Sequence, residues 1–344
     1  MTPPADPFES LSTLETRFAD GLATMLADHA GLGVYILVFA NTCFEPAARA
    51  RLSSVLTRRH GELLAAMADT LRQGHSLEQP DDDVMVFLKL DLIGVERIGT
   101  VEHRRCGPWH VLFNPLRALR PPRASRQLFG GLRRPLDPDG FHFNLPFLAK
   151  EVLWEGPLGG KFARLLYNKF PFARLHGLLV PEPQAALPQY LTPALHQWAW
   201  SLCSASGLPG LCLGYNSLGA GASVNHLHFQ SFIQAEPLPV QAEQFSHNGG
   251  TEPYPLPVLR FEDALEAWLE IDRLHSANMP YNLVYSQDCL HLVARRPQDD
   301  TALPDDSRGY GWSEMAGAVT LYSRDAFLSF DADAFASRLA RFAP

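Results

Sequence analysis

Cysteine is scarce in this 344-residue chain, and its spacing gives it no structural or metal-binding pattern. The five cysteines are widely separated and form no Cys-x-x-Cys pair, so neither a disulfide framework nor a zinc knuckle is expected. The longest apolar run, Val34 to Ala40, is too short to cross a bilayer. The first residues lack a basic segment followed by an apolar stretch, so we expect no secretory signal and a cytoplasmic location.

An excess of basic residues is also lacking. The chain carries 37 acidic and 29 basic side chains, for a net charge of −8. Extended nucleic acid needs a basic face to contact its phosphates, so we expect no nucleic-acid partner, and no membrane partner either. A small phosphorylated ligand needs only a few local cations and stays compatible with this charge. A content of 46% hydrophobic residues indicates a globular chain, long enough for one large domain or two smaller ones.

Hydrophobic periodicity predicts a mixture of helices and strands. Helices are expected over residues 8–29, 46–72, 193–206 and 261–276, with Thr192 as the N-cap of the third. Strands are expected over 32–39, 84–90, 111–113, 141–147, 151–154, 164–169, 176–180, 211–215, 224–232, 281–286 and 290–294. Residues 79–83 predict a turn or linker, and 115–140 and 235–260 predict loops rich in proline.

The most informative segment is Asn225-His-Leu-His-Phe-Gln230. In an extended strand, side chains alternate between faces, so His226, His228 and Gln230 are predicted to share one face. Leu227 and Phe229 then point into a core. The preceding stretch 214–223 contains three glycines, which let backbone approach a ligand and can offer N–H groups to an anion. The combination favours phosphate chemistry with an imidazole nucleophile.

Three interpretations of this segment compete. The first is a pair of hydrogen-bonded histidines on a half-buried strand, which the same-face triplet and the glycine-rich loop weigh against. The second is a metal site, since His-x-His presents two ligands. The next acidic residue, Glu236, lies eight positions after His228 and beyond the expected strand end, so we expect no metal.

The third interpretation is nucleotidyl transfer through a covalent histidine intermediate. Neutral His228 would attack the α-phosphorus of a nucleoside diphosphate ester. This chemistry needs one ring nitrogen without a proton, while the other donates to a backbone carbonyl or a polar side chain and fixes the tautomer. Gln230 is placed to bind a phosphate oxygen without adding negative charge, and His226 would steady the site or the leaving group.

The stretch from Leu213 to Gln230 resembles the active-site segment of GDP-L-galactose and GDP-D-glucose phosphorylases. These enzymes form a branch of the histidine-triad superfamily related to galactose-1-phosphate uridylyltransferase and diadenosine tetraphosphate phosphorylase. In that branch glutamine replaces the third histidine and the middle histidine is the nucleophile. The resemblance therefore implies His228, His226 and Gln230 as the catalytic residues, with His228 attacking phosphorus.

Further segments between residues 110 and 320 resemble the same family. They are Phe113–Pro122, Phe141–Asn144, Asn168–Pro181, Pro280–Leu283 and Trp312–Met315. The cysteine pair that binds metal in some uridylyltransferases is absent, so the resemblance implies no metal and no cofactor. Val224 and Asn225 stand where the uridylyltransferase pattern has Asn-Pro, which favours the GDP-hexose phosphorylase branch.

The resemblance implies an α+β, GalT-like histidine-triad fold with an antiparallel sheet, flanking helices and two related halves. We place an N-terminal helical and strand extension at 1–83, packed on a core at 84–344. Within the core, the active-site half spans about 84–235 and the C-terminal half about 250–344. A homodimer is compatible with the resemblance.

Six more residues are candidates for binding the substrate or its phosphates. Each also has a simpler explanation as a turn residue or a solvated loop cation, but Ser223 and Asn225 directly flank the histidine segment. The candidates are Asn168, Lys169, Gly221, Ser223, Asn225 and Arg120.

The function implied is a phosphorylase that cleaves a nucleoside diphosphate-hexose, with GDP-hexose favoured, and uses inorganic phosphate as the acceptor. One alternative is a diadenosine polyphosphate phosphorylase or adenylyltransferase. Another is a nucleotide-binding protein without catalytic activity.

Overall fold

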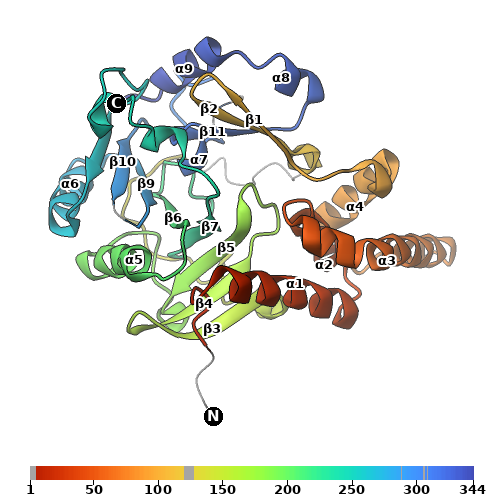
Figure 1. Ribbon diagram of the computed structural model, residues 1–344. Coiled ribbons are helices and arrows are strands. Elements are labelled where there is room, and N and C mark those ends of the chain that lie inside the picture. Colours follow the sequence, from red (N-terminus) through yellow and green to blue (C-terminus); the bar gives the residue numbers. More distant parts are fainter. Residues whose placement is uncertain (1–4, 120–127, 288, 305–306, 308) are drawn as a thin grey trace.

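An eight-stranded antiparallel sheet forms the centre of the molecule (Figure 1). The computed structural model describes residues 5–119, 128–287, 289–304, 307 and 309–344. The strand order is β3–β4–β5–β7–β6–β9–β10–β8. The bounds are β3 Val152–Leu158, β4 Lys161–Tyr167, β5 Arg174–Pro181, β6 Leu211–Asn216, β7 Phe229–Ile233, β8 Val258–Phe261, β9 Tyr281–Tyr285 and β10 Leu290–Ala294. Because β6 pairs with β9, both expected halves contribute strands to one continuous sheet. The predicted α+β class with an antiparallel sheet is confirmed.

A second, three-stranded sheet and most of the helices surround this centre. The small sheet has the order β1–β2–β11, with β1 Glu102–Cys106, β2 Trp109–Phe113 and β11 Ala318–Leu321. The helices are α1 Leu11–Asp28, α2 Leu32–Thr42, α3 Pro46–Arg72, α4 Asp81–Ile93, α5 Pro193–Ala205, α6 Ala264–Ser276, α7 Trp312–Met315, α8 Arg324–Leu328 and α9 Ala332–Ala340. Figure 1 shows α1 to α4 gathered on one side of the large sheet and α8 and α9 beside the small one.

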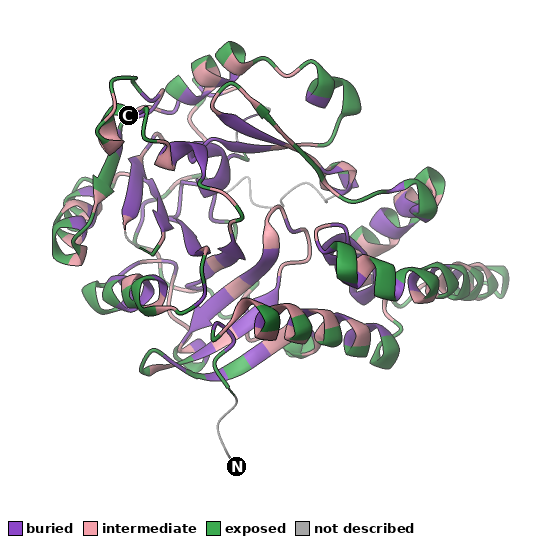
Figure 2. Ribbon diagram, in the orientation of Figure 1, coloured by how far each residue is buried: buried purple, intermediate pink, exposed green. Residues whose placement is uncertain are grey.

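The two faces of the large sheet pack against different apolar clusters. Phe229 of β7 and Leu283 of β9 belong to the main core, which also contains buried residues of α1, α2, α5 and α6. Alternate residues, Phe232 and Val284, belong to a second cluster with Trp312 and the small sheet. This division follows from the period-two alternation of side chains along a strand. Figure 2 shows the resulting burial of the central strands and the exposure of the outer faces of α1 and α3.

Two predicted strands in the N-terminal region are helices instead. Residues 32–39 lie in α2, where ten of eleven residues are buried, because the helix packs among α1, α3 and α4. A continuous apolar run has no period that distinguishes a buried helix from a buried strand. Residues 84–90 lie in α4, whose first turn carries Asp81, Asp82 and Asp83. Carboxylates there stabilise the positive end of the helix dipole.

Elsewhere the predicted elements agree more closely with the structure. The helix over 46–72 is confirmed as α3, and Thr192 caps α5 by accepting a hydrogen bond from the backbone N–H of Leu195. The expected strand at 141–147 is absent, and that segment forms turns that lead into the 3₁₀ turn Pro146–Glu151. The domain boundary predicted at residue 83 falls inside α4 and stays a prediction. Among the described helices, none combines the length and apolar character needed to span a bilayer.

Gly214 provides a test of how closely β6 packs against the indole ring of Trp312. It lies opposite Gln230 in the β6–β7 pair, and a Cβ added to it would be 2.4 Å from the indole ring of Trp312. We expect Gly214→Ala to lower the free energy of unfolding by about 1–3 kcal/mol, because the ring must move in a close-packed environment.

The matched control is Gly61→Ala on an exposed position of α3, where an added Cβ meets nothing within 4 Å. There alanine should stabilise the helix by roughly 0.5–1 kcal/mol. Chemical denaturation of both variants measures the difference, and equal stabilities would contradict the packing.

Candidate active site

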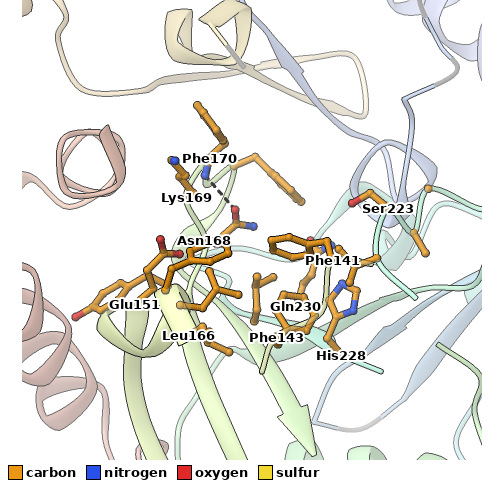
Figure 3. A pocket seen from close by; sticks show the side chains of 18 of the residues that line it. Phe141, Phe143, Glu151, Leu166, Asn168, Lys169, Phe170, Ser223, His228 and Gln230 are labelled. Atoms are coloured by element: carbon orange, nitrogen blue, oxygen red, sulfur yellow. Dashed lines mark hydrogen bonds between the residues drawn. The ribbon is translucent and has the colours of Figure 1, made fainter. Parts of the chain in front are cut away.

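A cavity of about 330 Å³ lies on the face of the sheet that points away from the main core. Its floor is a row of side chains across three neighbouring strands: Leu166 pairs with Leu178, and Leu178 pairs with Gln230. Phe141, Phe143 and the segment 221–224 form other parts of the wall. Figure 3 shows His228 and Ser223 toward one end of the cavity and Glu151 at the other. The size and mixed lining are those of a small-molecule site.

The side-chain amide of Gln189 holds the backbone of His228 on both sides. The backbone N–H of His228 donates to Gln189 Oε1 at 2.9 Å, and Gln189 Nε2 donates to the His228 carbonyl at 3.2 Å. The expected strand at 224–232 is therefore wrong at its start, because β7 begins only at Phe229. Before that residue, the Gln189 side chain takes the place of a neighbouring strand.

The alternation predicted for the histidine segment holds from residue 227 onward. Leu227 and Phe229 are fully buried in the main core, whereas His228 and Gln230 line the cavity. His226 is completely buried and lies outside the cavity lining. The structure thus brings two members of the predicted triplet together in the cavity and places the third behind them.

The imidazole of His228 has a defined tautomer. Its Nδ1 lies 2.8 Å from the carbonyl oxygen of His226. A carbonyl oxygen only accepts, so Nδ1 carries the proton and donates it. In the neutral ring the lone pair then resides on Nε2. This is the arrangement that a nucleophilic histidine requires, and it agrees with the donor to a backbone carbonyl expected from the sequence.

His226 supports this arrangement through its backbone and its packing. Its Nδ1 accepts a hydrogen bond from the backbone N–H of Phe143 at 3.0 Å. Burial, with smaller contributions from the neighbouring His228, His142 and Arg164, lowers the pKa of His226 to about 4. The ring is therefore neutral near pH 7, and its Nδ1 can accept from Phe143.

The amide of Gln230 also has only one consistent orientation. Its Oε1 accepts from Trp312 Nε1 at 2.9 Å and lies 3.2 Å from His176 Nε2. His176 Nδ1 accepts from the backbone N–H of Phe172, so His176 Nε2 carries the proton of the neutral ring. Burial lowers the pKa of His176 to about 3, which keeps it neutral. With two donors on Oε1, the NH₂ group of Gln230 is left as the group that can donate to a ligand.

The glycine-rich loop brings backbone N–H groups to the cavity. Gly221 has φ of +97° and lies against the backbone of Tyr310 and Gly311, so a larger residue does not fit there. Its own N–H donates to Gln298 Oε1 at 2.9 Å. The next residues in the lining, Ala222, Ser223 and Val224, make no backbone N–H hydrogen bond to other described residues. These N–H groups are suited to an anion.

One arginine lines the cavity among the described residues. Arg117 has a buried Nη1 without a hydrogen-bond partner in the described part of the chain, and its guanidinium lies 5.2 Å from the ring centroid of Phe172. Burial lowers the pKa of Arg117, opposed in part by Glu314. A buried cation with an unsatisfied donor is a ready partner for a phosphate group. The candidate Arg120 lies outside the described residues.

The other predicted binding residues have varied positions. Asn168 and Lys169 line the cavity, but Lys169 Nζ also pairs with Asp83 at 2.5 Å. Asn168 Oδ1 accepts from the backbone N–H of Phe170, as Figure 3 shows. Asn225 is outside the lining of this cavity. Its Oδ1 accepts from the backbone N–H of Gln189, and its Nδ2 donates to the carbonyl of Pro135.

Glu151 is a carboxylate that no motif in the sequence singles out. It ends the 3₁₀ turn before β3, is only 8% exposed, and lines the cavity. Its carboxylate makes no hydrogen bond or ion pair with another described residue. Burial raises the pKa of Glu151 to about 7, although Lys169 and Lys150 act in the opposite direction. A buried carboxylate without a partner is costly and indicates a ligand-binding role.

Residues 160–232 match the GDPGP1-like N-terminal domain. The matched segment runs from β4 through β7 and contains His226, His228 and Gln230. It is similar to the phosphorylase family that the motif resembles.

The chain is also similar to two curated phosphorylases. The chain is 37% identical to human GDP-D-glucose phosphorylase 1 over 126 residues, which cover 35% of this chain and 33% of the relative. It is 31% identical to GDP-L-galactose phosphorylase 1 of Arabidopsis thaliana over 147 residues, 38% of this chain and 33% of the relative. The chain therefore matches about one third of the length of these relatives.

Among solved structures, the yeast Ap4A phosphorylase Apa2 in complex with Ap4A is similar at 17% identity and a TM-score of 0.48. The comparison covers 70% of this chain and 89% of that one. The same enzyme in complex with AMP gives 16% identity and a TM-score of 0.48, with coverage of 78% and 97%.

The raised pKa of Glu151 predicts how stability depends on pH. Its folded-state value of about 7 exceeds the ordinary value of 4.5, so the native state binds the proton more tightly than the unfolded state. This contribution is complete below about pH 4.5 and is lost as the pH rises through about 7. The loss is on the order of 3 kcal/mol, at about 1.4 kcal/mol per pKa unit.

Glu151→Gln should remove this slope and be more stable than the unmodified protein at pH 8. Urea denaturation at pH 5, 6, 7 and 8 measures the effect, with the exposed Glu78→Gln as the control. If the free energy of unfolding changed with pH in the same way in the Glu151→Gln variant and in the unmodified protein, burial would not raise the pKa of the Glu151 carboxylate.

Proposed function

We propose that this protein is a nucleotidyltransferase that phosphorolyses a GDP-hexose through a covalent His228 intermediate. The observation that carries the proposal is the fixed tautomer of His228, whose Nδ1 donates to the His226 carbonyl in a cavity that also contains the oriented amide of Gln230. The similarity of residues 160–232 to the GDPGP1-like domain supports the GDP-hexose class.

The proposed reaction has two displacements. In the first, Nε2 of His228 attacks the α-phosphorus, the bond from that phosphorus to the bridging oxygen breaks, and hexose 1-phosphate leaves. In the second, an oxygen of inorganic phosphate attacks the same phosphorus, the N–P bond breaks, and GDP leaves with His228 restored. Splitting one displacement into two lets the acceptor enter after the leaving group has departed.

The remaining groups of the cavity have roles in binding and charge stabilisation. The NH₂ group of Gln230 donates to a non-bridging oxygen of the α-phosphate. Arg117 and the backbone N–H groups of residues 222–224 bind the phosphate groups and stabilise the negative charge that increases as phosphorus is attacked.

Other residues of the site bind the substrate or position these groups. Ser223 and Asn168 bind the phosphates or the ribose. His226 and Asn225 position the histidine segment, and Gly221 allows the loop its close approach. Lys169 adds positive charge at the end of the cavity where Glu151 lies.

Glu151 favours guanine as the base. The edge of guanine presents two adjacent donors, N1–H and the N2 amino group, and a carboxylate can accept from both. Adenine presents one amino donor beside the N1 acceptor, which a carboxylate repels. The apolar floor and the phenylalanine rings between Glu151 and His228 suit a planar base. This favours GDP-hexose over the diadenosine polyphosphate alternative.

The net charge of −8 fits small phosphorylated substrates better than nucleic acid. We retain a cytoplasmic location and a homodimer as parts of the proposal.

Replacing the proposed nucleophile tests the mechanism. We expect His228→Asn to lower turnover of GDP-hexose with phosphate by on the order of 10⁴-fold or more, because the covalent step is lost. Incubation of the unmodified protein with GDP-hexose, without phosphate, should give a guanylyl-histidine adduct on the peptide containing His228, measured by mass spectrometry.

Circular dichroism should show that this variant keeps its fold, and the exposed His75→Asn serves as the control for both assays. Turnover within tenfold of the unmodified protein, or an adduct on another residue, would contradict the assignment. If the unmodified protein binds the nucleotide but catalyses no phosphorolysis, the non-catalytic alternative is correct.

The base assignment has a separate test. At pH 8, where the carboxylate is ionised, Glu151→Gln should reduce kcat/KM for GDP-hexose by on the order of 10- to 100-fold, since a charged acceptor of two hydrogen bonds is lost. The same change should leave kcat/KM for ADP-hexose unchanged or raise it. The preference for guanine over adenine, measured as the ratio of the two kcat/KM values, therefore decreases in the variant. An unchanged ratio would refute the role of Glu151 while leaving the His228 mechanism untouched.

A further inference from the structure

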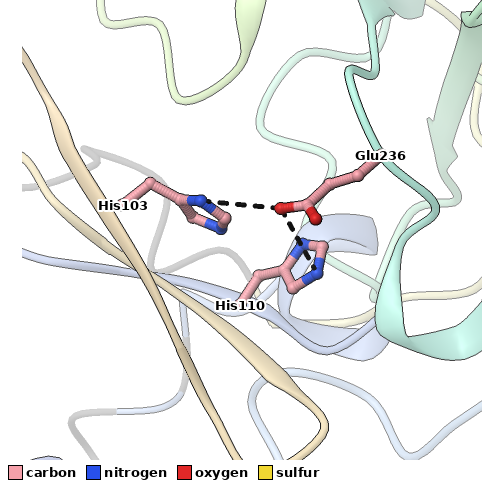
Figure 4. A group of neighbouring side chains, drawn as sticks. All are labelled: His103, His110 and Glu236. Atoms are coloured by element: carbon pink, nitrogen blue, oxygen red, sulfur yellow. Dashed lines mark ion pairs between the residues drawn. The ribbon is translucent and has the colours of Figure 1, made fainter.

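Three side chains from separate segments bring metal-binding atoms together beside the small sheet. His103 lies on β1, His110 on β2, and Glu236 follows the end of β7 (Figure 4). One nitrogen of each imidazole and one carboxylate oxygen all lie within 4.8 Å of one another. This cluster is separate from His228 and Gln230, which line the other cavity.

The hairpin explains how the two histidines meet. In the β1–β2 pair, His103 is opposite Leu112 and Arg105 is opposite His110. Side chains two positions apart along a strand share a face, so His103 and His110 lie diagonally across the same face of the hairpin. Their ring centroids are 5.0 Å apart in an edge-to-face arrangement. The chain after β7 then brings Glu236 to this face.

The distances are those expected between metal ligands. Glu236 Oε1 lies 3.6 Å from His103 Nδ1 and 3.9 Å from His110 Nε2. Both separations exceed an ordinary hydrogen bond. Two ligand atoms that each lie about 2.1 Å from a tetrahedral zinc ion are about 3.4 Å apart. To accommodate an ion, the carboxylate contacts would shorten by a few tenths of an ångström, and the two imidazole nitrogens, which lie within 4.8 Å of each other, would approach by up to about 1.4 Å.

The surroundings of the carboxylate also suit a metal. Arg105 pairs with Oε2, which leaves Oε1 facing the imidazoles. Metal ions bind neutral imidazole and ionised carboxylate.

We propose that His103, His110 and Glu236 form a binding site for Zn²⁺ or a similar borderline divalent cation. Two imidazoles favour such ions over Mg²⁺ and Ca²⁺, which prefer oxygen ligands. Three protein ligands leave one coordination position for water or a small ligand. All three side chains also line a second cavity of about 280 Å³, which gives that position access to a bound molecule. The ion ties the β1–β2 hairpin to the segment that follows β7.

No local pattern in the sequence indicates this site, because its ligands are separated by six and by 125 intervening residues. The expectation of no metal rested on the His226–His228 segment, where Glu236 is too far along the chain, and on the absence of a metal-binding cysteine pair. The fold instead combines Glu236 with histidines from the hairpin.

The experiment uses the full chain after treatment with a chelator and removal of the chelator. Isothermal titration calorimetry with ZnCl₂ should show one equivalent of tight binding, and CoCl₂ should give visible absorption bands of a four- or five-coordinate site. His103→Ala and Glu236→Gln should each weaken zinc binding by at least about tenfold. His75→Ala, an exposed histidine away from the cluster, should bind like the unmodified protein.

Unfolding temperature with and without zinc gives a second readout, because a ligand that binds only the native state raises it. His110 is buried, so the partly exposed His103 and Glu236 decide the outcome if His110→Ala does not fold. Two results would overturn the site. One is absence of zinc binding in the unmodified protein, and the other is a zinc affinity in the His103→Ala and Glu236→Gln variants equal to that of the unmodified protein. No substrate is needed, so the result is independent of the nucleotidyltransferase proposal.

Discussion

The contact between Gln189 and the backbone of His228 is the constraint on which the geometry of the candidate active site depends. Gln189 is almost fully buried, and it bonds both the N–H and the carbonyl of His228. It is held in turn by Asn225 and by the hydroxyl of Tyr215, which donates to the Gln189 carbonyl. The histidine backbone is thereby fixed before β7 begins, where regular strand pairing does not reach. The direction of its ring follows from this fixed backbone and from the His226 carbonyl.

The two faces of the large sheet have different surroundings. One face packs in the main core, and the opposite face lines the cavity. Leu227 and Phe229 fill the main core, while His228 and Gln230 between and beyond them face the cavity. Helices α1, α5 and α6 can therefore stabilise one side of β7 without occupying the side that lines the cavity. On the cavity side, hydrogen bonds to single atoms fix the tautomer of the neutral His228 ring and the orientation of the Gln230 amide.

The sequence predicted those parts of the fold whose pattern is local. The N-cap of α5, the long α3 and the alternation from Leu227 to Gln230 could all be predicted along the chain. The buried runs in α2 and α4 could not, because burial on every side removes the period that identifies a helix. The histidine motif identified His228 and Gln230. It did not point to Gln189 or Glu151, since each is brought to the site by packing between distant segments.

The contact of Gly214 with Trp312 has a consequence for how this site can diverge among related proteins. The indole that donates to Gln230 occupies the space that a side chain at position 214 would fill. Neither position can change in size alone without displacing the group that orients the glutamine. Natural variation at the two positions should therefore be correlated, with a larger residue at 214 accompanied by a smaller one at 312. A lineage that makes this exchange loses the indole donor and needs another group to hold the amide.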